Sequence, residues 1–208
     1  MSRTNRASRE NGRITRENLT FRSFILFSLK PYDKVTFSDI EKATGLSRGA
    51  ILYHFNSKQE IFNAVVESTL LNRTSILEIP IKEKDPLQSF IFDFVDSRKD
   101  VIKEMSKHGI KNMNLARYNI ESQALYFYDQ FDKLSRQMRT TELTVWTQVI
   151  KKSQDVNEID KKHDPAKLAS LFLNAYLGHA YSAAKEEKGC DTELLLDELM
   201  YLREISIS

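Results

Sequence analysis

The sequence predicts an all-α fold, in which a small N-terminal group of helices precedes a larger helical body. Glycine and proline are scarce, with 6 Gly and 4 Pro in 208 residues, whereas a strand-rich fold needs many turns built from these residues. Apolar side chains recur every three or four positions along most of the chain, which is the period of an amphipathic helix. No stretch alternates long enough to predict a strand.

Composition narrows the class of protein and its compartment. Cys190 is the single cysteine, so no internal disulfide can form and a reducing compartment is expected. The first residues contain no apolar stretch typical of a signal peptide. The sequence contains no run of about 18 apolar residues, so no membrane span is predicted. We therefore expect a cytoplasmic protein without a membrane partner.

Charge is distributed unevenly along the chain. Residues 1–58 contain 11 Lys or Arg and 5 Asp or Glu, whereas the other 150 residues contain 20 and 24. A basic front end on an acidic body favours contact between that end and a polyanion. Chance clustering of charges on a solvated face is the alternative interpretation.

Residues 1–13 are polar and basic, and they are predicted to form a flexible arm. Its arginines could enter a minor groove or contact phosphates, or the arm could simply aid solubility; they are Arg3, Arg6, Arg9 and Arg13. A first helix is expected from Ile14 to Lys30, because apolar residues there follow helical spacing and Pro31 should end it.

Residues 36–58 carry the sharpest local signals. Thr36 and Asp39 form the pattern of a capping box, which predicts a short helix from Thr36 to about Ala43. Gly45 can adopt the positive φ that ends such a helix. Ser47 can then cap a second short helix to about Phe55. Two short helices joined by a tight glycine turn predict a helix-turn-helix, whose second helix presents its outer face to a major groove.

A third capping pattern, at Ser57 and Glu60, predicts a longer helix to about Ile76. We expect a helix-turn-helix domain over residues 14–58 and a regulatory domain over residues 59–208. Further helices are expected after Asp85-Pro86 and Asp164-Pro165, because an Asp cap followed by Pro is a typical helix start. A short helical piece at 111–117, one or two helices from 120 to 150, and a last helix over 192–205 complete the prediction.

The run VTFSDIEKATGLSRGAILYHFNSKQEIFNAVV, residues 35–66, resembles the DNA-binding segment of the TetR/AcrR family of bacterial transcriptional regulators. The resemblance rests on Thr36, Gly45, Ser47 and Gly49, followed by the pattern Tyr53-His54-Phe55-x-Ser57-Lys58, and it covers roughly residues 14–70. It implies about nine helices and a C-terminal ligand-binding and dimerisation domain. It also implies an effector-responsive repressor that binds palindromic operator DNA as a homodimer and is associated with the nucleoid when bound. A small apolar or amphipathic effector would release it from the DNA or hold it there.

The resemblance and the position of the second short helix together assign the DNA contacts. The residues expected to contact DNA are Thr36, Ser47, Arg48, Gly49, Ala50, Tyr53, His54 and Lys58. Arg48 could bind guanine or a phosphate, and Gly49 would allow close approach of the backbone. Other interpretations are a plain N-cap at Thr36 and a partly buried packing role for Tyr53.

The larger domain offers weaker signals. An effector pocket could be lined by Phe90, Phe94, Tyr118, Tyr126, Phe127 and Trp146, although aromatic residues at helical spacing are more often plain core. The expected dimer interface lies on the last two helices and comprises Leu168, Phe172, Ala175, His179, Leu195, Leu199 and Leu202.

No catalytic, metal-binding or nucleotide-binding motif is present, so we expect neither an enzyme nor a cofactor. A regulator controlled by protein contacts is the first alternative, and it predicts no internal cavity above roughly 300 Å³. A helical enzyme is the second alternative, and it requires a cluster of carboxylates or a His pair in a cleft.

Overall fold

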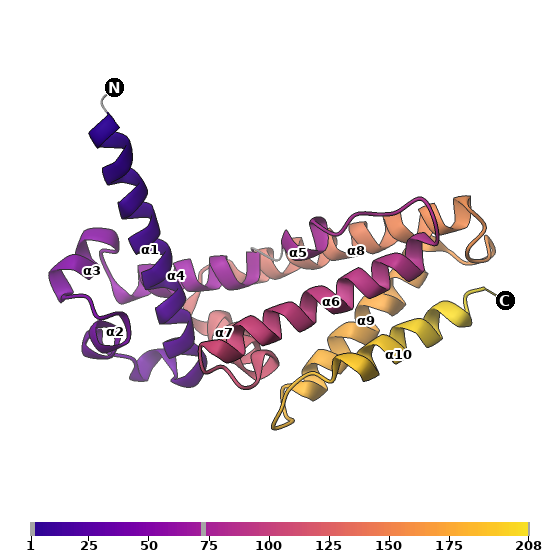
Figure 1. Cartoon of the computed structure of the whole chain (residues 1–208). Coiled ribbons are helices and arrows are strands. Elements are labelled where there is room, and N and C mark those ends of the chain that lie inside the picture. Colours follow the sequence, from indigo (N-terminus) through magenta and orange to yellow (C-terminus); the bar gives the residue numbers. More distant parts are fainter. Residues whose placement is uncertain (1–2, 72–73, 208) are drawn as a thin grey trace. The chain divides into compact units, whose positions relative to one another are not determined.

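The computed structural model describes the backbone of residues 3–71 and 74–207 and the side chains of residues 10–70 and 76–207. Within these ranges the protein is all-helical, as predicted (Figure 1). The elements are α1 (Arg3–Leu29), the 3-10 turn η1 (Tyr32–Lys34), α2 (Phe37–Thr44), α3 (Arg48–His54), α4 (Lys58–Val66), the π-helical turn η2 (Glu67–Leu71), α5 (Thr74–Leu77), α6 (Pro86–Lys107), α7 (Met113–Phe127), α8 (Phe131–Asp155), α9 (Pro165–Ala183) and α10 (Thr192–Glu204).

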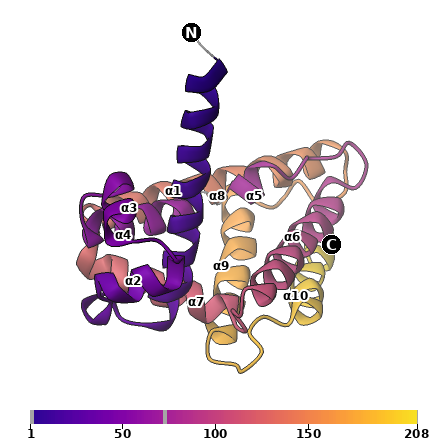
Figure 2. The same ribbon diagram turned by 60° about the vertical axis from the view of Figure 1, so that its left-hand side comes forward.

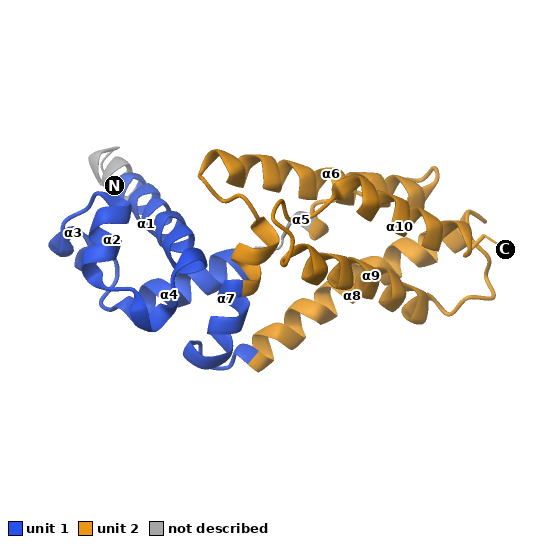
Figure 3. Ribbon diagram, turned by 90° about the horizontal axis from the view of Figure 1, so that it is seen from below, with its two compact units in different colours: residues 1–72, 119–131 blue, residues 73–118, 132–208 orange. Residues whose placement is uncertain are grey.

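The helices form two compact units (Figure 3). Unit 1 contains residues 1–72 together with residues 119–131, and unit 2 contains the remainder. This division differs from the predicted boundary after residue 58 in two ways. The whole of α4 belongs to unit 1, and a segment from much later in the chain completes that unit.

α1 is longer than predicted, because it begins at Arg3 and includes most of the expected arm. The side chains of Arg3, Arg6 and Arg9 lie outside the described residues. Arg13 forms ion pairs of 2.6 Å with both Glu10 and Glu17, one turn before and one turn after it. Such pairs stabilise an exposed helix. Figures 1 and 2 show this end of α1 extending beyond the other helices of unit 1.

The predicted helix 57–76 is interrupted. α4 ends at Val66 and continues only as the π-helical turn Glu67–Leu71, while α5 is a separate short helix. The Ser68 hydroxyl donates to the carbonyl oxygen of Val65 at 3.1 Å. Such local bonds compete with the regular helical ladder and bend helices. The spacing of apolar residues predicted a continuous helix here and did not reveal this interruption.

α7 is a single helix where a short piece at 111–117 was expected. Asn112 starts it, because its Oδ1 accepts a hydrogen bond from the Leu115 amide at 2.8 Å. Asn112 also donates to the carbonyls of Ala183 and Glu186, at 2.9 and 2.7 Å. α7 ends before Gln130, whose φ of 62° is left-handed and separates it from α8. The stretch from 120 to 150 is therefore divided between two helices.

The core of unit 2 is built from α6, α8, α9 and α10. α6 and α10 lie side by side in Figures 1 and 2. Large aromatic side chains fill the centre, and several are fully shielded from solvent: Phe90, Phe94, Trp146 and Phe172. Burial of such side chains contributes about 1.5–3 kcal/mol each before entropy is counted. This aromatic centre fixes the positions of the helices that surround it.

The start of α6 is capped from a distance. Asp85 was expected to cap it, but its side chain makes no capping hydrogen bond and its backbone is left-handed, with φ 46°. Glu158, between α8 and α9, instead accepts hydrogen bonds from the amides of Leu87 and Gln88, at 2.7 and 2.9 Å. The same carboxylate binds the Arg203 guanidinium at 2.8 Å. One buried carboxylate therefore connects α6, the α8–α9 loop and α10.

Glu158→Gln tests this connection. The amide would place a donor against the helix amides and would remove the charge that partners Arg203, whose side chain is only 15% exposed. We expect a loss of about 2 kcal/mol in the free energy of unfolding, measured by urea denaturation. Asp85→Asn is the control, since it retains the left-handed backbone and should change stability by less than about 0.5 kcal/mol. Equal losses in the two variants would contradict the assignment.

Candidate nucleic-acid interface

The first short helix of the predicted helix-turn-helix begins with a complete capping box. The Asp39 amide donates to Thr36 Oγ1 at 3.2 Å, and the Thr36 amide donates to Asp39 Oδ2 at 2.8 Å. The Thr36 hydroxyl also donates to the same carboxylate at 2.7 Å. Thr36 is exposed at the helix N-terminus, where a phosphate would be favoured. Its hydroxyl is nevertheless engaged with Asp39 in this structure.

The turn between α2 and α3 depends on Gly45. Its φ is 71°, a left-handed backbone conformation that residues other than glycine adopt at a free-energy cost. Its amide donates to the Glu41 carbonyl at 2.8 Å. Ser47 follows and caps α3, because its hydroxyl oxygen accepts from the Ala50 amide at 3.3 Å. The local signals in the sequence thus predicted both ends of this turn.

α3 is seated on unit 1 by one face only. Ile51 and the adjoining Phe55 are buried, as is Ile40 of α2, the helix that α3 contacts. The opposite face carries exposed residues, with Tyr53 84% exposed and its ring beside that of His54, 5.1 Å between centroids. Figure 2 shows α2, α3 and α4 gathered on one side of α1. The outer face of α3 therefore presents polar and aromatic groups to solvent.

The start of α3 has open space beside its backbone, so another molecule could approach the backbone closely. Gly49 is exposed, and a Cβ at this position would meet nothing within 4 Å. No contact with the described residues therefore requires glycine, although glycine in a helix costs about 1 kcal/mol against alanine. Arg48 beside it is exposed, pairs with Glu41 at 3.8 Å, and lies 5.3 Å from the Phe37 ring. Ala50 is half-buried.

Lys58 is placed differently from the expected phosphate contact. Its Nζ donates to the carbonyl oxygens of Tyr32 and Val35, at 2.8 and 2.9 Å, and lies 4.2 Å from the centre of the Tyr32 ring. Burial lowers the pKa of this ammonium below its ordinary value. In this structure Lys58 therefore ties α4 to the η1 turn, and any contact with DNA must be made from that position.

A residue that sequence reasoning missed connects α1 to the end of α3. Arg16 donates from its guanidinium to the His54 carbonyl, an orphan acceptor at the C-terminus of α3. The same guanidinium stacks on Phe55 at 3.8 Å and lies 4.0 Å from Glu60. No local pattern marks this role, because the partners are separated by 38 residues along the chain.

The segment 119–131 contacts the end of α1 and the η1 turn that follows it. Gln123 accepts from the Tyr32 amide at 2.6 Å and donates to the Phe27 carbonyl at 3.0 Å. Asn119 donates to the Ser28 carbonyl at 2.8 Å. These amide side chains satisfy the last carbonyls of α1, which have no partner within the helix. The ring of Phe127 packs 4.5 Å from that of Tyr32.

The six residues expected to line an effector pocket are divided between the two units. Phe90, Phe94 and Trp146 lie together in the core of unit 2. Tyr118 is 46% exposed and packs edge-on against Tyr181. The other two belong to unit 1, where they are Tyr126 and Phe127. The shared helical spacing did not reveal that α7 contributes residues to both units.

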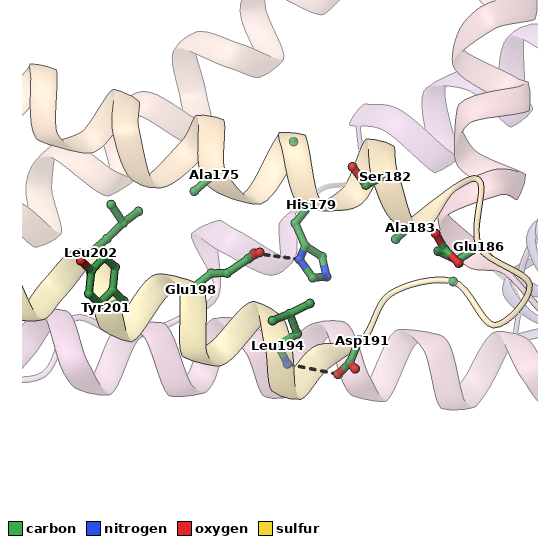
Figure 4. A pocket seen from close by; sticks show the side chains of 12 residues that line it. Ala175, His179, Ser182, Ala183, Glu186, Asp191, Leu194, Glu198, Tyr201 and Leu202 are labelled. Atoms are coloured by element: carbon green, nitrogen blue, oxygen red, sulfur yellow. Dashed lines mark hydrogen bonds and ion pairs between the residues drawn. The ribbon is translucent and has the colours of Figure 1, made fainter.

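The residues expected at a dimer interface are also divided. Four of the leucine and phenylalanine side chains are buried inside unit 2 itself: Leu168, Phe172, Leu195 and Leu199. The other three line a groove of about 620 Å³ between α9 and α10: Ala175, His179 and Leu202 (Figure 4). Within this groove His179 Nδ1 lies 2.8 Å from Glu198 Oε2. Apolar spacing could not distinguish a face turned toward the core from a face turned outward.

The fold and the outward face of α3 define a helix-turn-helix protein, in which a short helix is presented by a compact N-terminal unit. Residues 23–65 match the sequence model described as "Bacterial regulatory proteins, tetR family". The matched segment contains α2, α3 and nearly all of α4, so this part of the chain is similar to the DNA-binding segment of that family.

Curated relatives align over only part of their length. The chain is 31% identical over 74 residues to the biofilm operon icaADBC HTH-type negative transcriptional regulator IcaR of Staphylococcus aureus, covering 34% of the chain and 40% of that protein. It is 25% identical over 126 residues to IcaR of Staphylococcus epidermidis, covering 50% and 64%. The aligned region thus spans less than two thirds of each relative.

Solved structures resemble the whole chain in fold. A TetR family transcriptional regulator from Agrobacterium tumefaciens has a TM-score of 0.70 at 14% identity, covering 95% of this chain and all of that one. NalD, the secondary repressor of the MexAB-OprM multidrug efflux pump in Pseudomonas aeruginosa, has a TM-score of 0.65 at 14% identity, covering 95% and 97%. The SmeT–triclosan complex has a TM-score of 0.68 at 18% identity, covering 90% of each chain.

Within the described residues, no helix combines the length and the hydropathy needed to cross a bilayer.

The capping box predicts a pH dependence. Hydrogen bonds from Lys30 and Thr36 hold the pKa of Asp39 well below its ordinary value. The stabilisation is therefore present above the unfolded pKa, near 4, and is lost as pH falls further, because the unfolded chain then takes up the proton first. We expect Asp39→Asn to lower the melting temperature at pH 7, and the difference from wild type to shrink at pH 3. A difference independent of pH would contradict this role.

Proposed function

We propose that this protein is a transcriptional repressor that binds palindromic operator DNA as a homodimer, with α3 inserted into the major groove. The observation that carries the proposal is the one-sided seating of α3, which buries Ile51 and Phe55 and leaves Tyr53 84% exposed. A helix held in this way can enter a groove without losing its support. Unit 1 is assigned to DNA binding, and unit 2 to dimerisation and effector binding.

The direction of regulation is drawn from relatives. The staphylococcal relatives are named as negative transcriptional regulators, and NalD is named as a repressor. A repressor fits this chain because nothing more than tight operator binding is required of unit 1. The operator half-sites would lie about one DNA turn apart, since the two copies of α3 are related by a twofold axis.

The exposed residues of α3 divide into base and backbone contacts. Arg48 and Gly49 lie in the first turn of the helix, the part that meets base edges in a groove-entering helix. The Tyr53 phenol, one turn later, is suited to donate to a phosphate. Thr36 and Ser47 lie at helix N-termini, where backbone amides favour an anion. Lys58 contributes chiefly by holding α4 against η1.

Tyr53→Ala tests the interface, with Tyr126→Ala as the matched control. Both tyrosines belong to unit 1, and they are 84% and 82% exposed, so both changes should leave the fold intact. We expect Tyr53→Ala to weaken binding to DNA selected from random sequence by about tenfold or more, and Tyr126→Ala to leave it unchanged. Fluorescence anisotropy at several salt concentrations is the measurement.

Wild-type affinity should also fall steeply with salt, because phosphate contacts release counterions. Equal effects of the two alanine substitutions, or affinity independent of salt, would contradict the proposed interface.

The groove between α9 and α10 is the proposed dimer interface. It is flanked by exposed apolar side chains, with Leu171 55%, Leu194 50% and Tyr201 64% exposed. Gly178 lines it, and a Cβ there would meet nothing within 4 Å. A helical glycine with no role inside its own chain is explained by the close approach of another backbone. A second copy, related by twofold symmetry, would supply that backbone.

Two leucines provide a matched test of this interface. Leu194→Glu places a charge in the groove, whereas Leu125→Glu places one on an exposed leucine of unit 1, 66% exposed. We expect wild type and Leu125→Glu to have twice the monomer mass at micromolar concentration, and Leu194→Glu to be monomeric. Light scattering after size exclusion measures this. A dimeric Leu194→Glu variant would move the interface elsewhere.

An effector that binds unit 2 is the last part of the proposal. The structural relative SmeT is described in complex with triclosan, which establishes ligand binding only for that protein. For this chain we propose a small apolar or amphipathic effector that shifts the population of conformers away from the one that binds DNA.

A further inference from the structure

The groove between α9 and α10 contains a pair of titratable side chains that the proposed function does not use. His179 of α9 reaches across to Glu198 of α10, and its Nδ1 lies 2.8 Å from Glu198 Oε2 (Figure 4). The His179 side chain is only 8% exposed, whereas that of Glu198 is 44% exposed. Imidazole ordinarily takes up a proton at about pH 6.5, so this pair can change its charge within the physiological range.

The other charged groups of the groove are acidic. Glu186 follows α9 and Asp191 caps α10, and both line the same groove. Tyr201 also lines it and is uncharged near neutral pH. Among the described residues that line the groove, none is lysine or arginine. Each copy of the groove therefore contains three carboxylates and one imidazole.

The neighbouring groups do not supply a second titration near neutral pH. Burial, together with the carboxylates of Asp191 and Glu198, raises the pKa of the Cys190 thiol to about 11, so this thiol stays neutral. The Arg98 guanidinium of α6 acts on the thiol in the opposite direction, and it lies over aromatic rings outside the groove lining. Among the described residues of this region, His179 is therefore the group that changes charge between pH 6 and pH 8.

We propose that proton uptake by His179 controls dimerisation through this groove, so that the dimer becomes more stable as pH falls from 8 to 6. This inference rests on the proposed function, because it assumes that a second copy covers the groove. Water solvates the Glu198 carboxylate in a single copy, whereas a second copy would bury it. A buried charge without a charged partner is costly, and a proton on His179 supplies that partner.

Twofold symmetry makes the effect larger and sets its sign. A twofold interface uses the same patch of both copies, so it brings two acidic grooves together. Each imidazolium compensates one of the three carboxylates in its own groove, and the repulsion between the copies falls. The dimer therefore holds these protons more tightly than the separated copies do. By linkage, the species that binds more protons is favoured as pH falls.

Sedimentation of the full-length protein at pH 6.0 and pH 8.0, at constant ionic strength, tests the proposal. Fluorescence detection of labelled protein allows concentrations from nanomolar to micromolar. We expect the dissociation constant of the wild-type dimer to be lower at pH 6.0 by about tenfold or more. His179→Gln keeps a donor for Glu198 but cannot gain a charge, so its dissociation constant should be the same at both pH values.

His108→Gln is the matched control. His108 also lies beside a glutamate, with its Nε2 3.5 Å from Glu104 Oε1, but neither of these residues lines the groove. This variant should retain the wild-type pH dependence. Glu198→Gln removes the charge that the proton compensates, and it should dimerise at pH 8.0 about as tightly as wild type does at pH 6.0.

A wild-type dissociation constant that is equal at both pH values would overturn this proposal without affecting the proposed interface. A His179→Gln dimer that keeps the wild-type pH dependence would do the same. A protein that is monomeric at every pH and concentration would overturn both the inference and the proposed dimer. The measurement contains no DNA, because His54 at the end of α3 would add a titration of its own to operator binding.

Discussion

The seating of α3 on unit 1 is the constraint on which the rest of the structure depends. Ile40, Ile51 and Phe55 are buried together, and Gly45 makes the turn that brings α2 and α3 to the angle this packing needs. Because all of the apolar contact lies on one face, the other face remains free for a ligand of a different kind. A helix of seven residues would be only marginally stable alone in water, so α3 depends on packing against the rest of unit 1.

That support comes from distant parts of the chain. Arg16 of α1 binds the last turn of α3, and Lys58 of α4 binds the turn that precedes α2. Gln123 and Asn119 then hold the end of α1. Arg16, Gln123 and Asn119 satisfy carbonyls in the last turns of α3 and α1, which lack partners within those helices. Lys58 adds bonds to the carbonyls of Tyr32 and Val35. Polar side chains at the boundaries of unit 1 therefore complement its apolar core, and they fix where each helix begins and ends.

Local signals in the sequence predicted the capping box at Thr36, the left-handed Gly45 and the cap at Ser47, because each depends on residues within one turn. Long-range partners could not be predicted in the same way. Glu158 replaces Asp85 as the cap of α6, although the two are 73 positions apart. The outward face of α9 was also misplaced, because Phe172 and Leu171 are equally apolar and only packing decides which is buried.

Unit 1 is not continuous in the sequence, since residues 119–131 complete it. On the ribosome, the first 72 residues emerge well before that segment is synthesised. Until then the carbonyls of Phe27 and Ser28 can be satisfied only by water, and the ring of Tyr32 lacks its partner Phe127. Unit 1 is consequently completed late in translation, and a prematurely terminated product would lack the contacts that hold the end of α1.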